Sequence, residues 1–123
     1  MQLLLTQHRD PNLRSYFVWG PFIRSDNEAA ARENAQRFAA PNSMHFWTPT
    51  PKLGEDLSAT LRLPAGRTAW DVFLLYKKRT FWDSSPPAPA YWQQQLEVVQ
   101  GDPYDVTVFD AHIVRALESA SRP

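Results

Sequence analysis

Several short stretches of the chain have the apolar pattern of β-strands. The longest apolar run covers residues 72–76, where branched and aromatic residues follow one another without alternating polar positions. Such a run is typical of a central strand that is buried on both faces. We expect residues 80–82 to return as its antiparallel partner, with a buried strand at residues 13–19, a short strand at 43–47 and a short edge strand at 2–6.

Apolar residues at helical spacing predict two helices between these strands. Ser25–Glu28 has the form of a capping box, and the apolar positions after it run to Pro41, so we expect a helix that ends at about Ala39. Thr50 followed by Pro51 is a favourable N-cap and first-turn pair. The leucines that follow at i, i+4 and i+8 predict a second helix that ends at about Leu63.

The last third of the chain predicts two more helices. Residues 84–89 form a proline-rich linker, after which we expect a helix from about Pro89 to Gly101. Asp105 can cap a final helix with an apolar stripe at i, i+4 and i+8, made of Phe109, Ile113 and Leu117. Residues 104–109 also have strand propensity, so a strand is the alternative there, although the continuing stripe favours the helix.

The length and composition favour one folded domain. The chain has 123 residues, with a core expected at about 13–99 and a helical extension at about 102–120. Hydrophobic residues make up 43% and charged residues 21% of the chain, which favours a packed core over disorder. Because 13 Lys and Arg balance 13 Asp and Glu, we expect no nucleic-acid partner that is held by phosphate neutralisation.

Several kinds of chemistry are missing from the sequence. It has no cysteine, so disulfides, thiol nucleophiles and thiolate metal sites are excluded. His8, His45 and His112 are far apart and have no metal-ligand spacing, so we expect no metal or other cofactor. The glycines are isolated and no Gly-x-Ser-x-Gly is present, which argues against a phosphate loop and a serine hydrolase.

The N-terminal residues MQLLLTQHRD contain no basic leader. Their apolar run is too short for a signal peptide or a membrane span. If the sequence is complete, we expect a cytoplasmic protein without membrane contact, and a removed leader or a trimmed start is the alternative.

The order of the expected elements is strand, helix, strand, helix, strand, strand, helix, followed by an extra helix. The first buried strand leads into Trp19-Gly20-Pro21-Phe22 and then into a helix. Over about residues 13–99, this order and this tetrapeptide resemble the thioredoxin-like fold, whose motif at that place is Trp-Cys-Gly-Pro-Cys. The resemblance implies an α/β protein: a three-layer α/β/α sandwich with a mixed sheet of four to five strands, here with an added C-terminal helix.

The sequence departs from that family at its reactive positions. Both cysteines of the motif are gone, and Phe22 stands where the second would be. No proline lies near Trp70-Asp71, the place of the family's cis-proline. The family's thiol-disulfide chemistry is therefore absent, and the fold alone does not carry a function with it.

The loop formed by Trp19, Gly20, Pro21, Phe22, Ile23 and Arg24 is the first candidate site. A loop between a buried strand and a helix N-terminus is a natural recognition surface. The helix dipole and the free amides of that N-terminus favour an anion there, and Arg24 adds a positive charge. The alternative is that Phe22 and Ile23 pack into the core while Arg24 is solvated.

A second candidate is a pocket that combines a carboxylate with large aromatic rings. Its residues are Trp47, Trp70, Asp71 and Trp82, with Tyr91 and Trp92 as further aromatic members. Such a pocket suits a flat ligand or a partner protein, and burial would perturb the pKa of Asp71. The alternatives are an aromatic core and an Asp71 that accepts hydrogen bonds from amides at the strand end.

Three hypotheses about function follow. The first is a non-catalytic thioredoxin-like domain that binds a protein or peptide through the loop around Phe22. The second is a small-ligand carrier or enzyme that uses Asp71 in the aromatic pocket. The third is a subunit of a larger assembly, including self-association, with the linker at 84–89 and the surplus aromatic residues in its interface.

Overall fold

The computed structural model describes residues 2–122 and divides into two compact units, Met1–Pro51 and Lys52–Pro123. We call them the N-terminal and C-terminal units and describe each by itself. Within the described residues the chain is an α/β protein with four helices and five strands in two small sheets, neither of which closes into a barrel. The expected single mixed sheet of four to five strands is therefore wrong for these residues, because their strands pair in two separate ladders.

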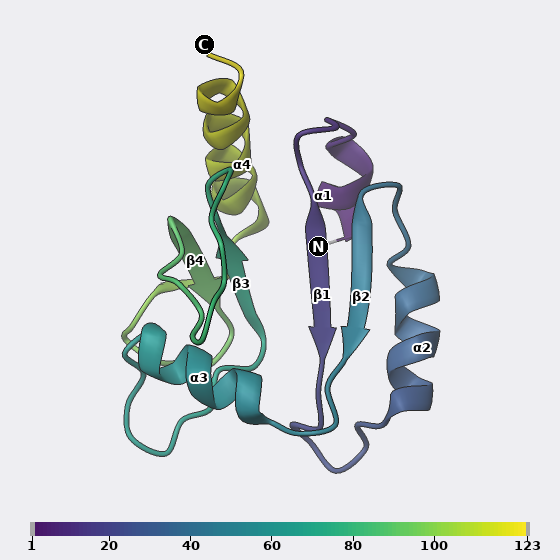
Figure 1. The fold of residues 1–123 in the computed structure, drawn as a ribbon, viewed down its shortest axis with the longest axis vertical. Coiled ribbons are helices and arrows are strands. Elements are labelled where there is room, and N and C mark those ends of the chain that lie inside the picture. Colours follow the sequence, from purple (N-terminus) through teal and green to yellow (C-terminus); the bar gives the residue numbers. More distant parts are fainter. Residues whose placement is uncertain (1, 123) are drawn as a thin grey trace. The chain divides into compact units, whose positions relative to one another are not determined.

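The N-terminal unit is a β–α–β arrangement preceded by a short helix. It contains α1 (Gln2–Gln7), β1 (Ser15–Trp19), α2 (Glu28–Arg37) and β2 (Ser43–Trp47). β1 and β2 are parallel, with Ser15 opposite Ser43 and Trp19 opposite Trp47, and α2 lies beside them (Figure 1). A helical crossover is the ordinary way to connect parallel neighbours.

Both strands of this unit were predicted, but its first element was not. Residues 2–6, expected as an edge strand, belong to α1, where Leu4 and Leu5 are both buried. A short apolar run does not distinguish a strand from a helix. The start of α2 also differs from the expected capping box, because Asn27 is the N-cap and accepts from the Ala30 amide.

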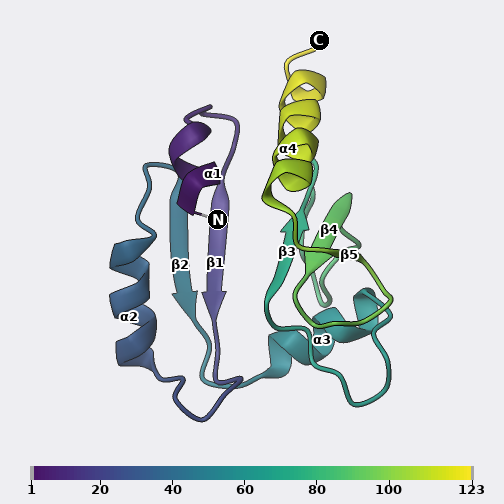
Figure 2. The ribbon, with the colours of Figure 1, turned by 180° about the vertical axis from the view of Figure 1, so that it is seen from behind.

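The C-terminal unit is a three-stranded mixed sheet with two helices. Its elements are α3 (Lys52–Thr60), β3 (Val72–Leu75), β4 (Tyr91–Gln94), β5 (Asp102–Pro103) and α4 (Val106–Ala120), as Figure 2 shows from behind. The sheet order is β3-β4-β5, with β3 antiparallel and β5 parallel to β4. Its buried core combines Leu57 and Leu61, near the C-terminal end of α3, with Ala69, which precedes β3.

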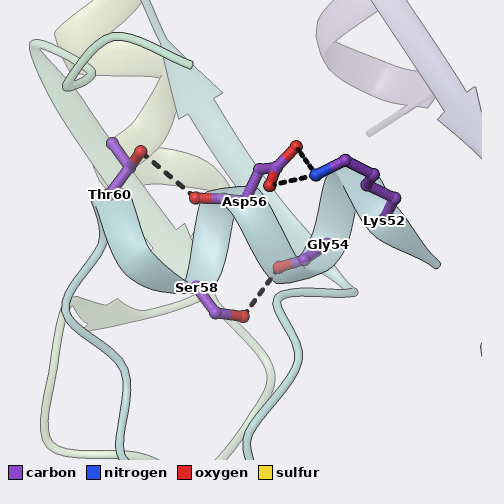
Figure 3. A network of polar contacts seen from close by, with 5 residues as sticks. All are labelled: Lys52, Gly54, Asp56, Ser58 and Thr60. Carbon is purple, nitrogen blue, oxygen red and sulfur yellow. Dashed lines mark hydrogen bonds and ion pairs between the residues drawn. The ribbon is translucent and has the colours of Figure 1, made fainter. Parts of the chain in front are cut away.

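Side-chain hydrogen bonds hold α3 to the chain around it. Ser58 Oγ donates to the Gly54 carbonyl within the helix (2.7 Å; Figure 3) and also accepts from the Ala69 amide (2.7 Å). Thr60 Oγ1 donates to the Asp56 carbonyl (3.3 Å; Figure 3) and to that of Pro86 (3.0 Å). These bonds fix the entry to β3 and one end of the long loop that follows β3.

Three predictions for this unit are wrong. β3 was expected to be a central strand buried on both faces, but it lies at the edge of the β3-β4-β5 sheet and its four residues are half-buried. Residues 80–82 form no strand and lie exposed, after a turn at residues 77–80 in which the Thr80 amide donates to the Lys77 carbonyl. The antiparallel partner of β3 is β4, which lies in the segment 89–101 that was expected to be a helix. The Asp105 cap is confirmed, since its carboxylate accepts from Thr107 and Val108, and helix is the correct alternative for most of residues 104–109.

Candidate functional site

The loop after β1 is held in one shape by its own side chains. Gly20 is buried, and a Cβ added there would lie 2.8 Å from the Phe22 ring, so the ring covers the glycine. The Asp26 carboxylate accepts from the amides of Phe22 and Ile23, both at 2.8 Å. These two amides are therefore already bonded to a carboxylate of the chain itself.

The exposure of the loop residues divides them into two groups. Trp19, Pro21 and Phe22 are half-buried, whereas Arg24 is exposed and Ile23 is 52% exposed. Of the six loop residues, Ile23 and Arg24 are therefore the most exposed, while Phe22 packs over Gly20.

Trp19 belongs to an aromatic cluster on the side of the β1–β2 sheet that Phe38, at the end of α2, contacts. Its Nε1–H donates to His45 Nδ1 at 3.3 Å, and the His45 ring stacks on Phe17 with centroids 4.5 Å apart. Phe38 stacks on Phe17 at 5.8 Å. Because Nδ1 accepts, the neutral ring carries its proton on Nε2, which is buried and has no hydrogen-bond partner among the described residues.

The opposite side of the same sheet is an exposed apolar surface, which we call the apolar strip. It consists of Tyr16 (60% exposed), Val18 (42%), Met44 (49%) and Phe46 (47%). Tyr16 lies opposite Met44 and Val18 opposite Phe46 in the ladder, and the Tyr16 and Phe46 rings stack diagonally at 6.5 Å. The strip is continuous because these residues alternate with the inward positions of both strands.

Sequence reasoning missed the apolar strip. Residues 13–19 were expected to be buried, since no polar residue inside the run 16–19 marks a solvent face. The sequence shows only that the side chains of a strand alternate between two faces, and it does not indicate which face is covered.

The residues of the predicted aromatic pocket lie in different settings. Trp47 is half-buried at the end of β2 in the N-terminal unit, whereas the other three belong to the C-terminal unit. Trp70 is 42% exposed, and Trp82 is 47% exposed with an edge contact to the Tyr76 ring at 5.7 Å. No described ring contact joins Trp70 to Trp82.

Asp71 is an exposed residue in a left-handed backbone conformation just before β3. Its φ is 55°, a value that aspartate tolerates better than most residues, and its carbonyl accepts from the Gln95 amide at 3.1 Å. Partial burial raises the pKa of its carboxyl group. The carboxylate of Asp71 was expected to accept hydrogen bonds at the strand end, but the acceptor there is its backbone carbonyl.

A polar network that the sequence did not indicate lies where β4, β5 and α4 meet. The Tyr91 hydroxyl donates to Asp102 Oδ2 (2.9 Å) and accepts from Gln93 Nε2 (2.8 Å), while Gln93 Oε1 accepts from the Asp105 amide (3.0 Å). The His112 ring stacks on Tyr91 with centroids 3.5 Å apart. Burial is the largest cause of the raised Tyr91 pKa, and the bond to Asp102 adds to it.

This network braces the fold and does not form a metal site. No group of three or more His, Asp or Glu side chains among residues 2–122 is arranged to hold a metal ion. The N-terminal unit has a small hollow lined by Leu5, His8, Leu13 and Asn42 among others.

Comparison with known proteins returns no match: no family model, no curated protein and no solved structure is similar to this chain. None of the described helices has the length and apolar character needed to cross a membrane.

Proposed function

We propose that the chain is a binding module for an extended polypeptide, without thiol chemistry, and that the partner docks on the apolar strip. The observation that carries this proposal is the strip itself: four large apolar side chains, adjacent across two paired strands and all more than 40% exposed. Contiguous apolar surface of this kind marks interaction sites, and aromatic residues and methionine are enriched in interfaces.

The neighbouring loop supports the same function. Ile23 adds an exposed apolar side chain and Arg24 an exposed charge beyond the end of β1. The Asp26 carboxylate holds the loop backbone, so these side chains are presented with little ordering cost on binding. Trp19, Gly20, Pro21 and Phe22 act as its support.

An extended segment is the occupant that suits the strands. Within the described residues β1 and β2 form a two-stranded sheet, so each pairs with one neighbour and has an edge without a ladder partner. Two-stranded sheets are only marginally stable, and an added strand gains main-chain hydrogen bonds while alternate side chains meet the strip.

We also propose that the chain is a divergent relative of the thioredoxin-like fold, in which two ladders replace the single mixed sheet. Its support is the element order and the sense of pairing: a parallel β1–α2–β2 unit, then α3, an antiparallel β3–β4 pair and a C-terminal helix. An experimental structure in which each unit superposes on the corresponding part of a thioredoxin-like domain would support this proposal. An experimental structure that does not superpose would refute it.

The alternative function, a small ligand bound by a carboxylate in an aromatic pocket, has weaker support. It needs Asp71 enclosed by rings, whereas Asp71 is exposed and the described ring contact of Trp82 is to Tyr76. We therefore place the binding function on the apolar strip.

Peptide selection tests the polypeptide-binding function. A random peptide library displayed on phage is selected against the immobilised protein, and the Kd of the enriched peptides is measured for wild type and Val18→Asp. We expect Val18→Asp to weaken binding by at least about tenfold, because a charge enters the apolar contact. Val99→Asp is the matched control, since Val99 is a 95% exposed valine outside the N-terminal unit.

Three outcomes would refute the proposal. One is that no peptide is enriched, and another is that both aspartate variants bind like wild type. The third is that Val18→Asp and the milder Val18→Thr both unfold the protein, which would show that the strip is interior. Self-association is tested by sedimentation, where a dimer lost in Val18→Asp would identify a second copy as the occupant.

A further inference from the structure

The loop that joins β3 to β4 is long and firmly anchored at its base. It covers residues 76–90, whereas hairpin loops usually have about two to five residues. Tyr76 Oη donates to the Pro87 carbonyl (3.2 Å), and Pro86 is buried with its carbonyl bonded to Thr60. Long loops that are held at the base and free at the tip are typically functional.

The tip of this loop carries a defined chemistry. Residues 77–85 are all exposed, and we call them the basic-aromatic tip. Lys77, Lys78 and Arg79 stand at a turn closed by the Thr80 amide and hydroxyl, which both donate to the Lys77 carbonyl (3.2 and 2.8 Å). Figure 1 shows the loop extending past the end of β3.

Two aromatic side chains follow the three cations, with Thr80 between them. Phe81 is 82% exposed, and Trp82 is 47% exposed while its ring contacts the edge of Tyr76. A phenyl ring left in water has no polar atom to solvate, so its exposure is unfavourable unless something covers it. No described ring contact involves Phe81.

We propose that the basic-aromatic tip is a peripheral contact for an anionic phospholipid surface. The three cations match the negative headgroups, and Phe81 and Trp82 are the residue types that enter the boundary between headgroups and acyl chains. This surface is separate from the apolar strip and does not depend on the polypeptide-binding function.

A lipid surface fits this tip better than a nucleic acid does. Single-stranded nucleic acid is held in a basic groove along which successive bases stack, and this tip is a protruding turn with every residue exposed. The zero net charge of the chain also gives no general attraction to phosphate, so the local cluster must provide it. The sequence predicts no membrane contact because it has no spanning segment, but a peripheral contact needs none.

Vesicle binding tests this proposal. The full chain is mixed with vesicles of equal parts phosphatidylserine and phosphatidylcholine or of phosphatidylcholine alone, and bound protein is measured by flotation. We expect binding to the anionic vesicles only, and a fall in binding as salt is added, because salt screens the attraction.

Two variants identify the groups that bind. Glutamine at all of positions 77–79 should weaken binding roughly a hundredfold. The matched control removes the same charge elsewhere in the C-terminal unit, with Arg67→Gln, Arg115→Gln and Arg122→Gln together, and should bind like wild type. Phe81→Ser should weaken binding by roughly tenfold, whereas Val99→Ser, at another exposed apolar residue, should not.

Several results would overturn the assignment. Equal binding to both vesicle types would exclude recognition of the anionic headgroup, and no binding to either would exclude the lipid surface altogether. Equal weakening by the two triple variants would show that overall charge alone attracts the chain. Loop-dependent binding to a single-stranded oligonucleotide or to polyglutamate, without binding to vesicles, would assign the tip to that class of partner instead.

Discussion

The three consecutive glutamines at the end of β4 allow a sharp test of the fold. Gln93 is 1% exposed and Gln94 3% exposed, while Gln95 lies in solvent. Gln93 Oε1 accepts from the Asp105 amide, at the N-cap of α4. Gln94 Oε1 accepts from the Leu96 amide, and its Nε2 donates to the Val98 carbonyl at 2.9 Å.

Leucine at each position removes these bonds at nearly constant volume. In Gln93→Leu the Asp105 amide loses its acceptor and the Tyr91 hydroxyl loses a donor, which costs about 1–3 kcal/mol for the first and less for the second. The buried leucine recovers about 1 kcal/mol by its apolar surface. We expect a net loss of about 2 kcal/mol for Gln93→Leu, a similar or larger loss for Gln94→Leu, and a change within about 0.5 kcal/mol for Gln95→Leu.

Urea denaturation followed by circular dichroism measures these losses, and amide hydrogen exchange locates them. The amide of Asp105 should exchange faster in Gln93→Leu, and that of Leu96 in Gln94→Leu. If Gln93→Leu and Gln95→Leu had equal midpoints and the Asp105 amide exchanged as in wild type, the reasoning would be refuted. That result would mean that residues 91–94 are not the strand described here.

Three further substitutions address single residues. Gly101→Ala should destabilise the protein by about 2–4 kcal/mol, measured by urea denaturation, because φ is +75° there and the new Cβ would lie 2.6 Å from the Trp92 ring. Asp71→Asn should raise the urea midpoint at neutral pH and lose that advantage at about pH 3. Burial raises the pKa of the Asp71 carboxyl group, so the folded state is penalised only at pH values where this group is charged, above its unfolded pKa. An unchanged midpoint at both pH values would contradict this prediction. Burial raises the pKa of Tyr76 to about 12 from 10.0. The stability should therefore hold up to about pH 10 and then fall as the pH approaches 12, by about 1 kcal/mol once solvent screening of the half-exposed side chain is taken into account. Tyr76→Phe removes the hydrogen bond to Pro87 and should lower the free energy of unfolding by about 1 kcal/mol at neutral pH. This variant should not show the loss of stability that Tyr76 causes above about pH 10.

Much of the secondary structure could be predicted from local patterns. The strand at 43–47 matches β2 residue for residue, and the Asp105 cap together with the stripe from Phe109 gives α4. α3 follows from its leucines and ends at Thr60, close to the expected end at about Leu63. In each case one short-range signal, strand propensity, a cap or a helical stripe, points in the same direction as the tertiary packing.

The segment 89–101 shows where local patterns are insufficient. Trp92, Leu96 and Val99 have helical spacing, yet Trp92 lies in β4 and packs over Gly101, and Val99 is 95% exposed. The decision depends on β3, whose backbone groups need a partner, and residues 91–94 supply one. The partner strand was expected directly after the charged turn at 77–79, but a long connection separates it from β3.

The candidate sites were predictable to different extents for a related reason. The loop at 19–24 was found because it lies between a strand and a helix. The two hydrogen bonds that Asp26, two residues beyond the loop, accepts from the Phe22 and Ile23 amides were not predicted. The apolar strip was not found, because both faces of β1 and β2 are apolar in sequence. Only the position of α2 distinguishes the covered face from the exposed one.

The tryptophans show why composition alone did not locate the binding surfaces. Four of the five were weighed together with Tyr91 as one aromatic set and Trp19 was placed in the loop after β1, yet the structure gives the tryptophans separate roles. Trp19 bonds to His45, and Trp92 packs against the buried core of the C-terminal unit. Trp82 follows the exposed charged turn, is 47% exposed and makes an edge contact with the Tyr76 ring. The contact proposed for the basic-aromatic tip therefore rests on three features that composition does not give: exposed rings, adjacent cations and a loop held at its base by the bond from Tyr76 to Pro87.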